Sequence, residues 1–268
     1  MKTDFNNRAN IPIKGKSNTW FSNVISKLQN LDLDNGVVKL TKNNSGIIEQ
    51  HIKNNPSYNL DLTKKIYEYW SGSGRNPKIR KAVMDLVRVI DIENSTNVWR
   101  YDKSKPQPGN LNSFTDVQLT KMVDFIVDPG RNFWDRLKNT DVTLVNDLQN
   151  SANWKGKNGN GPKSLASKIC KYFSELYCGI DGYYINDSVV RHVLPYYVYY
   201  YENRGSNRLK FTKKLGKTTK TAYDDIAYSD LYKLLDDLRH EINRVDNQNL
   251  TRNELDHLLW YCYRFESN

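Results

Sequence analysis

Residues 161–173 read GPKSLASKICKYF and are expected to form a helix directly after the loop KGKNGN at residues 155–160. Glycines in such a loop let backbone amides approach a ligand closely, because glycine has no Cβ atom. Pro162 suits the first turn of a helix, whose N–H groups point back toward the loop and attract anions. The stretch therefore predicts either a phosphate-binding helix end or an ordinary helix that follows a surface loop. The glycines and lysines that would hold the anion are Lys155, Gly156, Lys157, Gly159, Gly161 and Lys163.

The predicted helix carries a further lysine and precedes a lone aspartate. Leu165 and Ile169 recur at helical spacing and predict the buried stripe, whereas Lys168 projects from another part of the cylinder. After the helix ends in SELYCGIDG, Asp187 of YINDSVV stands where the next helix is expected to begin. An aspartate in that position accepts backbone N–H bonds and stabilises the helix end by about 1 kcal/mol. Asp187 is therefore a candidate site residue or a structural cap.

Most of the remaining sequence has the periodicity of helices, which predicts an all-α, two-lobed protein. Residues 91–112 interrupt this periodicity with two prolines and a glycine, so we expect them to link an N-terminal helical region, 1–110, to a second helical region, 111–268. The alternative to helix is a hairpin formed by VYYYEN and RLKFTKKL. The further helices are expected at 19–29, 45–55, 61–70, 77–90, 113–127, 131–139, 140–150, 229–245 and 254–265, the last opened by a capping box of Thr251 and Glu254.

Composition excludes several classes of protein. The three cysteines fit a reducing cytoplasm, and they are too few for an iron–sulfur cluster with four cysteine ligands from this chain. The four histidines lie far apart without metal-ligand spacing, so we expect no metal and no cofactor. The sequence has no run of about 18 apolar residues and no apolar signal-peptide core near its start, so we expect no membrane association and a cytoplasmic location.

The charge balance favours a polyanionic partner. Forty basic residues against 30 acidic ones give a net charge of +10, and contacts from lysine and arginine to phosphate dominate non-specific binding to nucleic acid. Residues 204–220 are especially rich in cations, which predicts either a solvated loop or a contact to the DNA backbone. The cations of this segment are Arg204, Arg208, Lys210, Lys213, Lys214, Lys217 and Lys220.

Taken together, the glycine-rich loop, the lysine-bearing helix and the later INDSVV motif resemble the helix-hairpin-helix DNA glycosylases, especially the 8-oxoguanine type. The resemblance covers residues 113–200 best, although the loop lacks the leucine–proline–glycine order that is usual in the family. It implies that loop amides hold a DNA phosphate, that a lysine is the nucleophile and that Asp187 is the catalytic carboxylate. Lys163 matches the family lysine by its place after Gly161, and Lys168 matches it by residue context and by lying nineteen residues before Asp187.

This resemblance implies excision of an altered base from double-stranded DNA, with or without lyase activity. A carboxylate near C1′ stabilises an oxocarbenium-like transition state, and a neutral lysine can attack C1′ to give a Schiff base. The target base must first leave the duplex. Two other interpretations remain open: a non-catalytic DNA-binding protein of the same fold that acts in regulation or phage defence, and a helical interaction protein whose positive charge is incidental.

Overall fold

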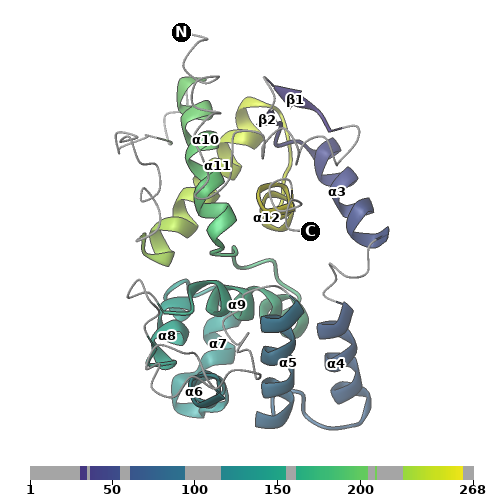
Figure 1. The fold of residues 1–268 in the computed structure, drawn as a ribbon, viewed down its shortest axis with the longest axis vertical. Helices are drawn as coiled ribbons and strands as arrows, with labels where there is room; N and C mark the ends of the chain where they lie inside the picture. The colour runs from purple at the N-terminus through teal and green to yellow at the C-terminus, as the bar shows by residue number, and fades with distance from the viewer. Residues whose placement is uncertain are drawn as a thin grey trace, which may run out of the picture. The chain divides into compact units, whose positions relative to one another are not determined.

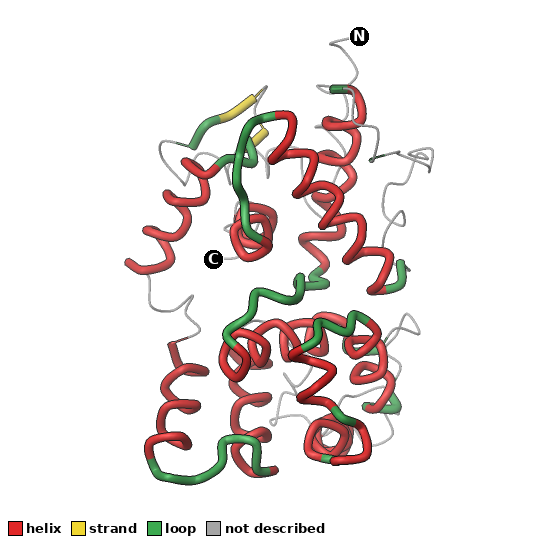
Figure 2. Tube along the Cα trace, turned by 180° about the vertical axis from the view of Figure 1, so that it is seen from behind, coloured by secondary structure: helices red, strands yellow, loops and turns green. Residues whose placement is uncertain are grey.

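The computed structural model is mostly helical (Figures 1 and 2). The prediction of an all-α protein is thus confirmed at the level of helical content, and two strands of two residues each are the exception among the described residues. In the part of the chain that the structure describes, no helix is both long and apolar enough to cross a bilayer. The described residues are 31–34, 37–54, 61–93, 116–154, 161–204, 209 and 226–261.

The chain divides into two compact units that do not follow its order in sequence. One unit contains the described residues within Met1–Asn54 and Asn186–Asn268, and the other contains those within Asn55–Ile185. We refer to them as the discontinuous unit and the central unit. The boundary expected near residue 110 lies outside the described residues, as does the expected helix at 19–29.

In the discontinuous unit, helices from both ends of the chain share one core. Helix α12 packs against α3 and α10, and α10 and α11 also pack together. The strands pair antiparallel, with Leu33 opposite Val38, and the Tyr197 hydroxyl of α10 donates to the Val38 carbonyl at 2.7 Å. The elements are β1 (Leu33–Asp34), β2 (Val37–Val38), α3 (Lys42–Asn54), α10 (Ser188–Asn203), α11 (Tyr228–Val245) and α12 (Arg252–Tyr261).

Charged groups tie the two sequence segments of this unit together. The Lys42 ammonium, at the start of α3, lies 2.6 Å from the Glu254 carboxylate in the first turn of α12. Glu254 also accepts from the Thr251 backbone N–H at 2.8 Å, and the Thr251 hydroxyl accepts from the Glu254 N–H at 3.2 Å. These reciprocal bonds confirm the capping box. Burial raises the pKa of Glu254, but the hydrogen bonds from Lys42 and Thr251 outweigh it and hold that pKa below its ordinary value.

The central unit is a bundle of consecutive helices. Helix α9 packs against α5, α7 and α8, while α4 packs against α5 and α5 against α6. Figure 1 shows α4 and α5 side by side. The elements are α4 (Asp61–Gly72), α5 (Arg80–Glu93), α6 (Asp116–Val127), the short 3₁₀ helix η2 (Pro129–Arg131), α7 (Phe133–Lys138), α8 (Thr143–Ser151) and α9 (Lys163–Cys178).

Two local predictions are wrong. The helix expected from Pro77 begins only at Arg80, because residues 77–79 form a turn that the Asn76 side chain stabilises by accepting from the Lys78 N–H at 2.9 Å. The hairpin suggested for VYYYEN does not form, because these residues continue α10 to Asn203. Most of RLKFTKKL lies outside the described residues.

Candidate functional site

Helix α9 begins without a side-chain cap. Pro162 occupies the N-cap position and makes no side-chain cap hydrogen bond, while the Lys163 N–H donates to the Gly161 carbonyl at 2.8 Å. Gly161 packs against α8: a Cβ atom at this position would lie 2.8 Å from Cγ of Gln149. A side chain at this position would displace the flexible Gln149 side chain of α8, and the N-cap residue of α9 supplies no side-chain hydrogen bond to the first turn.

The rest of the predicted phosphate-binding loop cannot be placed. Gly161 and Lys163 are half-buried at the start of α9. The predicted DNA-binding residues outside the described residues are Lys155, Gly156, Lys157, Gly159, Arg208, Lys210, Lys213 and Lys214.

Lys168 lies in a continuous buried stretch of α9. Every residue of α9 from Leu165 to Ser174 is buried, and Lys168 itself has no exposed surface. The expected apolar stripe of Leu165, Ile169 and Phe173 is confirmed as core. Lysine side chains are almost always exposed unless they are paired. Nothing in the sequence therefore indicated that Lys168 is buried.

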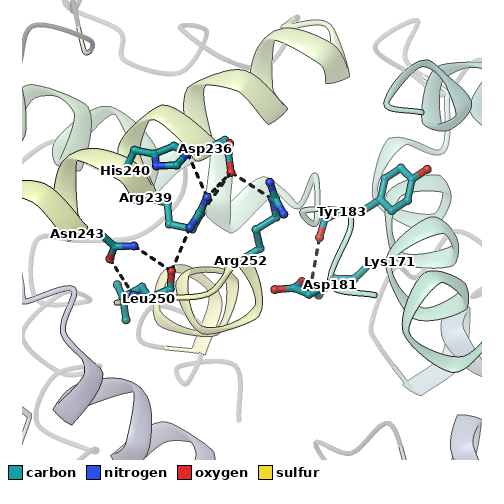
Figure 3. Close-up of polar contacts among 9 residues, drawn as sticks. All are labelled: Lys171, Asp181, Tyr183, Asp236, Arg239, His240, Asn243, Leu250 and Arg252. Carbon is teal, nitrogen blue, oxygen red and sulfur yellow. Dashed lines mark hydrogen bonds and ion pairs between the residues drawn. The ribbon is translucent and has the colours of Figure 1, made fainter. Parts of the chain in front are cut away.

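A second lysine of α9, which the sequence analysis passed over, is also buried. Lys171 is 1% exposed, and its ammonium lies 3.2 Å from Glu175 and 3.3 Å from Asp181. It also donates to the Tyr183 carbonyl at 3.4 Å (Figure 3). The contacts with Asp181 and Tyr183 join α9 to residues 179–185, which follow it without regular secondary structure. The sequence did contain a signal, because Lys171 falls within the apolar stretch ICKYF.

Through Tyr183, residues 179–185 also contact the end of α7 and the loop between α7 and α8. Its hydroxyl lies 3.3 Å from the Asp141 carbonyl and 3.4 Å from the Arg136 carbonyl. Arg136 in turn pairs with Asp141 at 2.7 Å and with Asp147 of α8 at 2.6 Å. Burial raises the pKa of Asp141, but hydrogen bonds from Thr143 and Arg136 outweigh it and lower that pKa. The segment before Asp187 is therefore held at Lys171 and at Tyr183.

Asp187 is the N-cap of α10. One of its carboxylate oxygens, Oδ1, accepts from the Val189 N–H at 2.8 Å, and the residue is half-buried. The preceding Asn186 is buried and accepts from Arg191 at 2.6 Å. Asp187 belongs to the discontinuous unit, whereas both candidate lysines belong to the central unit. The predicted cavity shared by the aspartate and a lysine thus stays a prediction.

No model of a protein family matches this chain, and comparison with curated proteins and with solved structures gives no match either.

Arg204, a predicted DNA contact, is exposed and pairs with a carboxylate of the same unit. At the C-terminal end of α10, its guanidinium lies 2.6 Å from the Asp246 carboxylate and 5.2 Å from the centre of the Tyr200 ring. The Tyr201 hydroxyl donates to the same carboxylate. Burial, together with this hydrogen bond, raises the pKa of Tyr201. Arg204 thus links α10 to the end of α11.

A polar cluster on α11 and α12 fixes these two helices together (Figure 3). Asp236 lies 3.1 Å from Arg239, 3.2 Å from Arg252 and 3.4 Å from His240. Within the described residues, no group of three acidic, histidine or cysteine side chains is arranged to hold a metal ion. The cluster has the character of a structural ion-pair network.

Proposed function

We propose that this chain is a DNA glycosylase of the helix-hairpin-helix type that excises an altered base from double-stranded DNA in the cytoplasm. In this proposal, α8, the residues that follow it and α9 act as the helix-hairpin-helix element of a two-lobed protein. The observation that carries the proposal is the start of α9, where Gly161 precedes a first turn that carries Lys163 and whose N-cap, Pro162, makes no side-chain hydrogen bond. Lys168, which the resemblance assigns as the nucleophile, is fully buried in the same helix, so DNA binding must expose its amine before it attacks C1′.

The charge and the start of α9 support the same function. The chain has a net charge of +10, and the first turn of α9, preceded by Gly161, has no side-chain cap. An uncapped helix N-terminus beside a basic loop suits a DNA phosphate. Lys163 is the alternative nucleophile and otherwise a phosphate contact.

The chemistry assigns one role to each group. Asp187 stabilises the positive charge that develops at C1′ as the bond to the base breaks. The lysine amine forms a bond to C1′ as the base leaves, and the amine then loses its proton. The sugar ring opens as the C1′–O4′ bond breaks, and the resulting imine permits β-elimination of the 3′ phosphate. In a monofunctional enzyme, Asp187 would instead activate water, and the lysine would only contact the backbone.

The test is borohydride trapping on duplexes that contain 8-oxoguanine, uracil or an abasic site. Borohydride reduces an imine to a stable amine, so we expect a covalent protein–DNA complex with one of these duplexes. Lys168→Gln should abolish the complex, and Lys163→Ala should retain it while weakening binding to the duplex. Lys121→Ala, at an exposed lysine of α6, is the control. If no duplex gives a trapped complex or a released base, the proposal is wrong.

One observation is equally compatible with a second candidate function, a non-catalytic DNA-binding protein that acts in regulation or phage defence. Asp187 already accepts a hydrogen bond from Val189, which a purely structural cap would also do. This candidate predicts salt-dependent binding to duplex DNA, with no base release and no trapped complex.

A further inference from the structure

The connection between α4 and α5 carries an excess of exposed positive charge that the proposed function does not use. Between residues 64 and 81, Glu68 is the one carboxylate. All of the cations in this stretch are exposed: Lys64, Lys65, Arg75, Lys78, Arg80 and Lys81. The stretch therefore presents an anion-attracting surface of the central unit.

Carboxylates neutralise only part of this charge. Arg80 pairs with Asp124 at 2.7 Å, and Lys81 pairs with Asp85 at 3.4 Å. The other four cations have no carboxylate partner among the described residues. Arg75 instead lies over the Trp70 ring, with Cζ 5.7 Å from the centroid, and the Lys78 ammonium lies 4.8 Å from the centroid of Trp134. Cations that rest on aromatic faces are positioned yet keep their full charge for an external anion.

An exposed aromatic ring lies within the same surface. Tyr69 is 67% exposed, the highest value among the large hydrophobic side chains of the described residues. Its ring meets the buried Trp70 edge-to-face, with centroids 5.7 Å apart. Lys65 precedes Tyr69 by four residues and therefore lies on the same face of α4. The ring is thus supported from one side and open to a ligand on the other.

The loop that carries Arg75 and Lys78 is ordered by its own hydrogen bonds. The Ser73 hydroxyl donates to the Trp70 carbonyl at 2.8 Å, and the Gly74 N–H donates to the Ser71 carbonyl at 3.2 Å. Gly74 has φ of 68°, a conformation that favours glycine. Because these bonds already order the loop, binding through it loses little conformational entropy.

We propose that Lys65, Tyr69 and Arg75, here called the Tyr69 surface, bind single-stranded nucleic acid. One unpaired base stacks on the Tyr69 ring, and the cations contact the flanking phosphates. An open aromatic ring among cations without carboxylate partners is the arrangement by which proteins bind single strands without regard to sequence. Duplex DNA does not fit this surface, because its bases are stacked on one another and leave no face for the Tyr69 ring. An acidic protein would use the cations but leave the exposed ring without a role. This proposal does not depend on the glycosylase activity.

The test is fluorescence anisotropy of a labelled twelve-residue oligothymidylate at low salt. We expect Tyr69→Ala to weaken binding about fivefold to a hundredfold, the range measured when a stacking ring is removed, and Tyr69→Phe to bind like the wild type. Lys65→Ala with Arg75→Ala should lower the slope of log K against log salt by about 1.4, since each phosphate contact to a single strand contributes about 0.7. Parallel titrations with oligouridylate show whether the surface distinguishes DNA from RNA.

The controls are Val117→Ala and Lys121→Ala, at an exposed apolar side chain and an exposed lysine of α6 in the same unit. Neither should change binding, and Lys168→Gln should retain it even if base excision is lost. Tyr69 is mostly exposed, so its substitution should leave the melting temperature unchanged. The proposal is overturned if the wild type does not bind the oligonucleotide, if Tyr69→Phe is as weak as Tyr69→Ala, or if Tyr69→Ala weakens duplex binding equally.

Discussion

Gly182 lies in the non-helical segment before Asp187, and replacing it with alanine tests how that segment is packed. Gly182 is buried, and a Cβ atom there would lie 2.9 Å from Oγ1 and 3.5 Å from Cγ2 of Thr140. Its φ is outside the left-handed range, so alanine is compatible with the backbone. The effect of Gly182→Ala should therefore depend on the side chain at position 140.

Two opposing terms set the magnitude. Forcing an extra methyl group into a packed site costs about 1–3 kcal/mol, whereas replacing glycine by alanine where the backbone permits it stabilises by about 0.4–1 kcal/mol, because the unfolded chain loses freedom. Gly182→Ala alone should therefore destabilise the protein by about 1–2 kcal/mol. Thr140→Ala removes both close atoms and leaves the Thr140 Cβ at 3.7 Å, an ordinary contact distance. In the Thr140→Ala background only the stabilisation that comes from the less flexible unfolded chain remains. Gly182→Ala should therefore increase the free energy of unfolding there, whereas it decreases it in the wild type.

The assay is thermal unfolding followed by circular dichroism in the four variants of a double-mutant cycle. At about 2–4 °C per kcal/mol for a chain of this size, Gly182→Ala should lower the melting temperature by about 2–8 °C in the wild type. In the Thr140→Ala background it should raise the melting temperature by about 1–4 °C. Shifts of the same sign and size in both backgrounds would refute the packing argument, since the two sites would then be independent.

Three further predictions concern stability. Thr251→Ala should reduce the unfolding free energy by about 1 kcal/mol in urea titrations, because the α12 capping box is lost; an unchanged midpoint would contradict this. The pKa of Glu254 is lower in the folded protein than its ordinary value of about 4.5. The ionised carboxylate should therefore stabilise the protein above pH 4.5, and this stabilisation should be lost as the pH falls through the pKa of Glu254 in the folded state. The stability difference between wild type and Glu254→Gln should accordingly shrink in melts below pH 4.5, and a constant difference would argue against it. Lys171→Met should lower the free energy of unfolding in urea by about 3 kcal/mol. This is the lower end for a broken buried ion pair, because Asp181 keeps some solvent contact. Lys171→Met with Asp181→Asn should recover part of the lost free energy.

Local features of the fold could be predicted from the sequence. The capping box at Thr251 and the apolar period of α9 involve residues within one or two helical turns, so their signals are contiguous in the chain. The union of both chain ends in one unit could not be predicted. It depends on contacts such as that of Lys42 with Glu254, 212 residues apart, and helical periodicity shows which face of a helix is buried but not its partner.

The candidate site was harder to predict for the same reason. Arg204 was expected to contact DNA because it begins a basic segment, and nothing in the sequence indicated that it also pairs with Asp246 at the end of α11. The apolar stretch around Lys171 indicates that this lysine is buried, but not that Asp181 and the Tyr183 carbonyl are its partners. The partner that determines the environment of a charged side chain is usually remote in sequence.

The cap made by Asp187 does not by itself decide between the two candidate functions. A catalytic carboxylate must be held in one place, and a hydrogen bond from the Val189 N–H does this. Capping and catalysis therefore require the same geometry and differ only in whether the negative charge is needed. Asparagine caps a helix about as well as aspartate, so Asp187→Asn removes the charge while it leaves α10 capped. If the carboxylate is catalytic, this variant should melt like the wild type, bind duplex DNA nearly as well and lose about a hundredfold or more in turnover. If Asp187→Asn keeps both the turnover and the DNA affinity of the wild type, Asp187 is only a cap.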